Sequence, residues 1–399
     1  MTLDSDGRSG MTAKKHGDLG LSYLSLSYCL QIVTVAILTL VFAKPGTLSA
    51  AESGKVPGLS DRMPGVVKVE SNGPATYSIP IRVPPPTAGL GPNLAFVYNS
   101  QGGNEWLGMG WSISGLPVID RCPRTIAQDG FAGGVNLDTN DRFCMDGARL
   151  NAVSGVYGND GTEYRTEVDK FVKVVSKGAV TGGSGPLYFI AQTKDGLTME
   201  FGNSPTSAIE AQGKSTIRVW ALSKLQDKKG NYLKVTYSEV NAQGHYRPDR
   251  IEYTYNDGGG VTTATRSVRF TPETRTDVWP MYVGGSVITI PERITHVTTY
   301  VGETPVRDYV LQYEYGTATK RSRLKSITEC AGAACMPAHV FEWQEGGNGT
   351  YTPVAYNYPN VNFTPGYVWS GDYDGNGKID LATIENGRLS IVAKVLAIL

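Results

Sequence analysis

From residue 53 onward, hydrophobic and polar positions alternate along short stretches of the chain. A period of two, filled by β-branched and aromatic residues, is typical of strands with one buried face. No stretch of this part has the period of a long amphipathic helix. The clearest alternating stretches are 75–79, 94–98, 171–175, 233–237, 250–255, 287–290 and 310–315. The pattern predicts an all-β fold.

Turn-forming residues separate these stretches. Examples are Asn159-Asp160-Gly161, Lys194-Asp195-Gly196 and Lys229-Gly230-Asn231. Asn-Gly and Asp-Gly pairs readily adopt the positive φ that tight hairpins need. The strands are therefore expected to be antiparallel and joined mostly by hairpins.

Composition and charge narrow the class of protein. Glycine and proline number 48 and 22, and 40% of the residues are hydrophobic, which is enough to build a core. Lys+Arg and Asp+Glu both number 37, so the formal net charge is zero. A nucleic-acid-binding protein normally carries a basic surplus on one face. The charge balance therefore argues against a nucleic-acid partner.

The N-terminal segment has the layout of an export signal. Residues 19–43 carry no charge, Lys14 precedes them, and the small residues 49–51 follow. We predict a signal peptide at 1–51, or one that starts at Met11, and hence a secreted protein. The alternative is a retained anchor, because about 20 apolar residues can span a bilayer. We expect membrane contact only through this segment.

The mature chain divides into two parts at a glycine-rich stretch. Gly346-Gly347-Asn348-Gly349 opens a predicted linker at 346–359. We expect one β domain at 53–345 and a second element at 360–399.

Four cysteines remain once Cys29 leaves with the signal. An even number in an exported chain indicates disulfides, with three possible connectivities. Local pairing, Cys122 with Cys144 and Cys330 with Cys335, is the simplest. A zinc site is the alternative, although the spacings lack the C-x2-C pattern of such sites.

The clearest candidate binding motif lies near the C-terminus. Counted from Asp372, residues with oxygen-bearing side chains stand at alternate positions, and Gly377 stands at the sixth. A single loop with this spacing can wrap around Ca²⁺. Thr383 stands where an EF-hand has its bidentate Glu, and the flanks 367–369 and 379–384 look like strands. We predict a weak calcium site between two strands, a polar hairpin turn being the alternative. The predicted ligands are Asp372, Asp374, Asn376, Lys378 through its carbonyl, and Asp380.

Two parts of the chain resemble known families. The Asp-x-Asp-Gly-Asn-Gly-x-x-Asp loop of 372–380 resembles the FG-GAP/VCBS repeat of integrin-like β-propellers. The part from about 60 to 345 resembles the SpvB-like domain that opens the B component of insecticidal toxin complexes and RHS/YD-repeat proteins. The segments that carry this second resemblance are 73–81, 94–104, 107–116, 121–123, 127–130 and 141–147.

The resemblance implies a fold and a role. It implies a hairpin-rich SpvB-like β domain followed by the start of a β-propeller. Because a propeller needs about four to eight blades and one repeat is present, this is one incomplete blade, and we expect a truncated copy of a longer protein. The implied role is non-catalytic: a β-shell for toxin encapsulation, secretion or display. The implied partners are other toxin-complex or RHS components, or a downstream polypeptide.

Two other functions are weighed against this one. A calcium-dependent, adhesin-like binding module is the first, and the carrier half of an enzyme toxin is the second. The chain has no Glu-x-Glu of an ADP-ribosyltransferase, no Gly-x-Ser-x-Gly, no His-Glu-x-x-His and no Walker loop. We therefore predict no enzyme and no catalytic residue.

A few further residues have plausible chemistry but a simpler explanation. Asp129, Asp141 and Asp146 lie near the first cysteine pair, and paired carboxylates can catalyse hydrolysis. Turn aspartates are the commoner case. Trp106 and Trp111 are interpreted as core residues, with glycines beside them at a tight corner.

Overall fold

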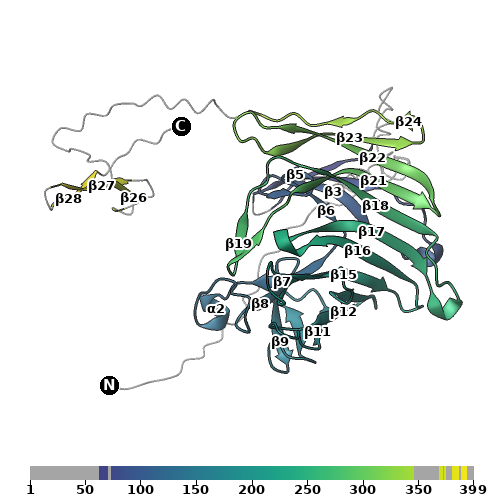
Figure 1. Ribbon diagram of the computed structural model, residues 1–399, viewed down its shortest axis with the longest axis horizontal. Helices are drawn as coiled ribbons and strands as arrows, with labels where there is room; N and C mark the ends of the chain where they lie inside the picture. Colours follow the sequence, from purple (N-terminus) through teal and green to yellow (C-terminus); the bar gives the residue numbers. More distant parts are fainter. Residues whose placement is uncertain are drawn as a thin grey trace, which may run out of the picture. The chain divides into compact units, whose positions relative to one another are not determined.

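The computed structural model describes residues 63–70, 73–345, 368–371, 373, 380–385 and 388–392 (Figure 1). The described residues form two compact units. The described part of the first comprises 63–70, 73–314 and 322–341, and the second includes 315–321 and the residues from 342 onward. Both units consist mainly of antiparallel strands, so the all-β prediction is confirmed. The predicted signal at 1–51 and linker at 346–359 lie outside the described residues.

The first unit contains a closed, eight-stranded antiparallel barrel, whose strands lie at one end of the unit (Figure 1). Each strand pairs with the next along the chain, and the last closes the ring by pairing with the first, where Val219 lies opposite Asp120. The barrel strands are β7 (Val118–Cys122), β8 (Arg142–Met145), β9 (Ala148–Ser154), β10 (Glu163–Thr166), β11 (Val172–Lys177), β12 (Tyr188–Thr193), β13 (Thr198–Phe201) and β15 (Ile217–Gln226). The short β14 (Ala208–Glu210) pairs with the N-terminal half of β15.

An open antiparallel sheet begins at the C-terminal end of β15. Residues 224–226 of this strand pair with β16, and the sheet continues strand by strand to β23 (Figure 1). Its strands are β16 (Tyr232–Val240), β17 (His245–Tyr255), β18 (Arg266–Thr274), β21 (Glu292–Val301), β22 (Thr304–Tyr315) and β23 (Ser322–Ala331), with β24 (Ala334–Cys335) and β25 (His339–Val340) on β23. Barrel and open sheet thus share one long strand.

A smaller sheet covers one face of the open sheet. It consists of β1 (Val66–Val69), β2 (Ala75–Ile81), β3 (Leu94–Asn99) and β6 (Trp111–Ser114). The rings of Phe96 and Tyr309 lie 5.7 Å apart across the two sheets. The Tyr253 hydroxyl donates to the Pro84 carbonyl at 2.8 Å, and the Arg82 N–H donates to the Tyr309 hydroxyl at 2.7 Å. These contacts pack the smaller sheet and the loop after β2 against the open sheet as a sandwich.

Short elements complete the first unit. The hairpins are β4 (Asn104–Glu105) with β5 (Gly108–Met109), and β19 (Met281–Val283) with β20 (Ser286–Ile288). The helical turns are η1 (Thr87–Gly89), α2 (Ile126–Asp129), η2 (Asn241–Gln243) and η3 (Asp257–Gly259). Among the described residues, no helix has the length and apolar character needed to cross a bilayer.

The described part of the second unit includes one small antiparallel sheet. It consists of β26 (Val368–Gly371), β27 (Asp380–Glu385) and β28 (Arg388–Val392), with β27 in the middle. The flanks of the predicted calcium loop are therefore strands, as the sequence indicated.

The strand prediction was accurate in position and less so in extent. The stretch 287–290 is strand only to Ile288.

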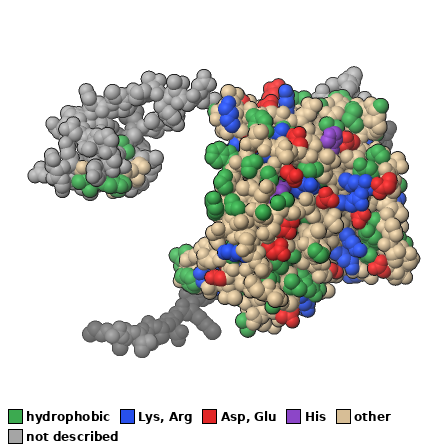
Figure 2. Space-filling model, viewed as in Figure 1, with side chains coloured by type: hydrophobic (Ala, Val, Ile, Leu, Met, Phe, Trp, Pro, Cys, Tyr) green, Lys and Arg blue, Asp and Glu red, His purple; other side chains and the backbone are tan. Residues whose placement is uncertain are grey.

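Figure 2 shows acidic and basic side chains intermixed on the face in view, in keeping with the zero net charge.

Candidate functional site

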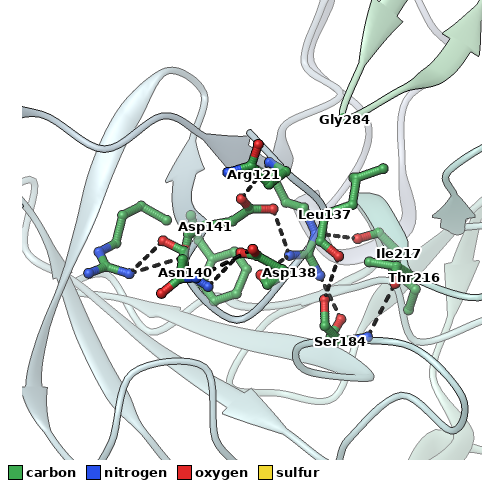
Figure 3. Close-up of polar contacts among 12 residues, drawn as sticks. Arg121, Leu137, Asp138, Asn140, Asp141, Ser184, Thr216, Ile217 and Gly284 are labelled. Carbon is green, nitrogen blue, oxygen red and sulfur yellow. Dashed lines mark hydrogen bonds and ion pairs between the residues drawn. The ribbon is translucent and has the colours of Figure 1, made fainter. Parts of the chain in front are cut away.

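A cluster of buried polar groups centred on Arg121 connects barrel strands to neighbouring loops (Figure 3). Arg121 and Asp141 form an ion pair of 3.0 Å, and both side chains are 1% exposed. The arginine also donates from Nε to the Ile217 carbonyl (2.7 Å), from Nη1 to that of Asp138 (3.0 Å) and from Nη2 to that of Ser184 (2.6 Å). One side chain thereby joins strand β15 to two loops.

Aromatic rings surround this arginine inside the barrel. Its guanidinium lies 5.5 Å from the ring centroid of Trp220 and 5.8 Å from that of Phe143. Phe189 packs edge-on against both rings, at 5.1 and 5.3 Å. Burial lowers the pKa of Arg121, and Asp141 opposes that shift. Large side chains therefore fill this region of the barrel, which is a packed core with a charged centre.

The other two aspartates near the first disulfide also have structural partners. Asp129 accepts from Arg142 at 2.8 Å and from Arg149 at 2.5 Å. Although burial would raise the pKa of Asp129, hydrogen bonds from the Thr125 backbone and these arginines lower it. Asp146 accepts from the Val118 N–H at 3.0 Å. Asp129, Asp141 and Asp146 therefore hold arginine side chains and turn backbone in place. They are not arranged as an acid–base pair.

The structure contains two disulfides, both local. Cys122–Cys144 links β7 to β8, with Cα atoms 5.8 Å apart, and Cys330–Cys335 closes the β23–β24 turn, with Cα atoms 4.0 Å apart. This is the simplest of the three connectivities, and it leaves none of the four sulfurs available to zinc. No cluster that could hold a metal ion is found among the described residues.

The predicted calcium ligands lie largely outside the described residues. Of Asp372, Asp374, Asn376, Lys378 and Asp380, only Asp380 is described, through its backbone. It lies opposite Gly371 in the β26–β27 pair, which closes the loop of residues 372–379. The calcium site therefore stays a prediction.

A second buried ion pair positions the β4–β5 hairpin. Arg275 Nη2 lies 2.6 Å from Asp277 Oδ2, and the side chains are 0% and 1% exposed. Asp277 also accepts from the Ser322 N–H (2.6 Å) and from Asn104 (3.0 Å). Burial alone would raise the pKa of Asp277, but these donors hold it well below its usual range. Asp277 thus connects the β4–β5 hairpin, through Asn104, to β23, through Ser322.

A cavity of about 230 Å³, here named the Trp106 cavity, lies next to this hairpin. Trp106 Nε1 donates to the Tyr246 carbonyl at 2.8 Å, and the two rings meet edge-to-face at 5.4 Å. The lining residues come from the β4–β5 hairpin, β7, β15, the start of β17 with the residue before it, and the β19–β20 hairpin with the residues after it: Glu105, Trp106, Val118, Asp120, Arg218, Val219, Gly244, His245, Tyr246, Met281, Ile288, Thr289 and Ile290. Figure 1 shows β19 running along the side of the unit toward β7.

The charged groups of the Trp106 cavity are incompletely paired. Burial raises the pKa of Asp120 to about 6, against the opposing charge of Arg218. Arg218 Nη2 donates to the Gly244 carbonyl at 3.2 Å, whereas its buried Nε has no partner among the described residues. The sequence analysis interpreted both Trp106 and Trp111 as core residues. Trp106 is only half-buried and lines this cavity. Trp111 is 2% exposed and is a core residue, as predicted.

Sequence reasoning missed the arginines that organise these sites. Ile119 and Arg121 are both buried and lie two residues apart in β7, so the arginine occupies a core-facing position. A charged residue at an inward position of an alternating strand requires a buried counter-charge. That signal marks Arg121, but its partners come from distant loops that the sequence does not identify.

Comparison with known proteins places this framework in a family. The family model described as Salmonella virulence plasmid 65kDa B protein, SpvB, matches residues 69–270. This is just over half of the chain, and it includes the complete barrel and the start of the open sheet. The chain belongs to the SpvB family. The resemblance of the first part of the chain to the SpvB-like domain is thereby confirmed. The resemblance of residues 372–380 to an FG-GAP/VCBS repeat stays a prediction.

Solved structures share the SpvB-family fold at low sequence identity. A crystal structure of TcdB2-TccC3 matches at a TM-score of 0.60 and 16% identity, over 82% of this chain and 19% of that one. A Photorhabdus luminescens Tc holotoxin pore with a mutation in TccC3 matches at 0.64 and 16%, over 82% and 18%. The N-terminal domain of effector protein SpvB from Salmonella typhimurium strain LT2 matches at 0.51 and 17%, over 64% and 98%.

These matches differ in how much of the other protein's length they cover. The chain spans about a fifth of the length of TcdB2-TccC3 but nearly all of the SpvB N-terminal domain. No curated protein sequence matches the chain.

Proposed function

We propose that this SpvB-family chain is a non-catalytic structural component of a toxin complex of the Tc/RHS type. Its β framework contributes to a shell that encapsulates, secretes or displays a toxic polypeptide. The observation that carries the proposal is the fold shared with TcdB2-TccC3 over 82% of the chain. The proposed partners are other toxin-complex components or a downstream polypeptide.

The internal architecture supports a wall and not an active site. The buried Arg121 and Arg275 are held by ion pairs and backbone carbonyls, and Arg121 lies between packed rings in the barrel. Side chains fixed in this way make a rigid element that resists deformation. Rigidity is what a protein needs in order to enclose cargo.

Two assays test this role. Purified full-length chain is mixed with toxin-complex components and analysed by size-exclusion chromatography, where we expect co-elution and protection of the toxic polypeptide from protease. The same chain is assayed for ADP-ribose transfer and for ester, peptide and glycoside hydrolysis, where we expect no turnover. Failure to co-elute with any component would contradict the assembly. Turnover abolished by one substitution, at unchanged thermal stability, would contradict the non-catalytic role.

Export is part of the same proposal. A shell protein with two disulfides fits an oxidising compartment outside the cytoplasm. N-terminal sequencing of the secreted chain should find cleavage near residue 51. An intact N-terminus in the membrane fraction would instead support the retained anchor.

A calcium-dependent binding module is the second candidate function. The observation that favours it is the pairing of Gly371 with Asp380, which closes the acidic loop between two strands. A weak site, with a dissociation constant of about 10⁻⁴–10⁻³ M, would suit an extracellular module. Terbium luminescence should show binding that calcium displaces and that Asp374→Ala removes, with Asp195→Ala as the control. Binding unaffected by Asp374→Ala would leave the polar-turn alternative.

A further inference from the structure

The Trp106 cavity has more negative than positive charge on its wall. Glu105 and Asp120 supply two carboxylates, and Arg218 supplies one guanidinium. Burial lowers the pKa of His245, so this residue adds no positive charge at neutral pH. The cavity therefore has an excess of one negative charge.

The positive charge of Arg218 is directed partly elsewhere. Its Nη2 donates to the Gly244 carbonyl, and its guanidinium lies 5.9 Å from the ring centroid of Tyr246. Glu239, outside the cavity lining, also attracts it. No ion pair within 4.0 Å joins Arg218 to Asp120, and the Asp120 carboxylate accepts only from its own backbone among the described residues. Asp120 thus lacks the close partner that a half-buried carboxylate normally has.

The remaining wall suits a cation. Trp106 contributes an aromatic ring to the wall, and the negative faces of such rings attract ammonium and guanidinium groups. The volume of about 230 Å³ lies below the range of about 300–1,000 Å³ typical of sites for drug-sized ligands. The cavity therefore fits one compact group, such as a single side chain.

We propose that the Trp106 cavity binds a single organic cation, a guanidinium or ammonium group. The cation lies between Asp120 and Glu105, against the ring of Trp106. The side chain of an arginine or lysine residue has this chemistry. This site is independent of the proposed role as a shell component.

Calorimetry on the full-length chain tests the proposal with three small probes. Propylguanidinium is a free monovalent cation, N-acetyl-arginine methylamide represents a polypeptide side chain, and N-acetyl-citrulline methylamide is the uncharged isostere of the arginine amide. We expect saturable binding of the two cations and none of the citrulline amide. Tighter binding of the arginine amide identifies a polypeptide side chain as the preferred occupant, whereas equal or tighter binding of propylguanidinium identifies a small free cation.

Variants locate the site. Asp120→Asn should weaken binding tenfold or more, because the negative charge that pairs with the bound cation is lost. Glu105→Gln, at the exposed rim, should weaken it less, and Asp195→Asn, in an exposed turn far along the sequence, should not change it. Thermal melts of each variant verify the fold. Binding of the citrulline amide as tight as that of the arginine amide, no binding of either cation at about 10 mM, or binding unchanged in Asp120→Asn would overturn the proposal.

Discussion

Arg121 and Asp141 form an ion pair of 3.0 Å in which each side chain is 1% exposed. They lie 20 residues apart in the chain, and the pair anchors the loop that precedes β8 to the inner wall of the barrel. Both charges were removed from water on folding, so each depends on the other for compensation.

Removal of one partner should therefore be costly. Asp141→Ala leaves the Arg121 guanidinium buried without its counter-charge, and we expect a loss of about 3–5 kcal/mol in the free energy of unfolding. Urea denaturation followed by tryptophan fluorescence measures this change.

A surface pair provides the matched control. Arg269 and Glu303 form an ion pair of 2.7 Å, but the Glu303 side chain is 80% exposed. Glu303→Ala should cost much less stability than Asp141→Ala, because water compensates for the lost partner. Similar losses in the two variants would contradict the structural importance of the buried pair.

The local parts of this fold were predictable, and the long-range parts were not. Alternation and Asp-Gly turns identified strands such as β2, β3 and β17, and the spacing of Cys122 and Cys144 favoured a local disulfide. Closure of the barrel depends on the pairing of Val219 with Asp120, about 100 residues apart, which no local pattern encodes. Arg121 likewise finds its carbonyl partners 17, 63 and 96 residues away.

The two disulfides should differ in their contribution to stability. On the loop-entropy account, the ring closed by Cys122–Cys144, with a sequence separation of 22, contributes about 3 kcal/mol, and that of Cys330–Cys335, with a separation of 5, about 2 kcal/mol. The paired Ser variants Cys122→Ser/Cys144→Ser and Cys330→Ser/Cys335→Ser should lose stability in that order. The reverse order would show that packing at the second bridge matters more than ring size.

Gly115 should not tolerate a side chain. Its φ is +93°, and an added Cβ would lie 2.1 Å from the Asn93 carbonyl oxygen. Gly213 also has a positive φ, of +72°, but an added Cβ would meet nothing within 4 Å. Gly213→Ala should cost about 1–2 kcal/mol from the backbone alone, and Gly115→Ala clearly more, since the backbone must also move. Equal melting temperatures of the two variants would be inconsistent with the close approach at the corner before β7.

Asp120 should make the protein less stable as the pH rises through about 6. Burial raises its pKa from 3.8 to about 6, so the ionised carboxylate is disfavoured in the folded state relative to the unfolded one. The penalty is absent below about pH 4, develops between pH 4 and 6, and is complete above pH 6. The other titratable or charged groups that line its cavity are Glu105, Arg218, His245 and Tyr246.

Asp120→Asn therefore should stabilise the protein at pH 8 and have no effect at pH 3.5. A shift of about two pKa units corresponds to roughly 1–3 kcal/mol in the free energy of unfolding. Urea denaturation of wild type and variant at several pH values gives the difference directly. Asp195→Asn, in an exposed turn, should leave the difference near zero throughout. A stability difference between wild type and Asp120→Asn that is independent of pH would assign the effect to packing and not to the charge of this carboxylate.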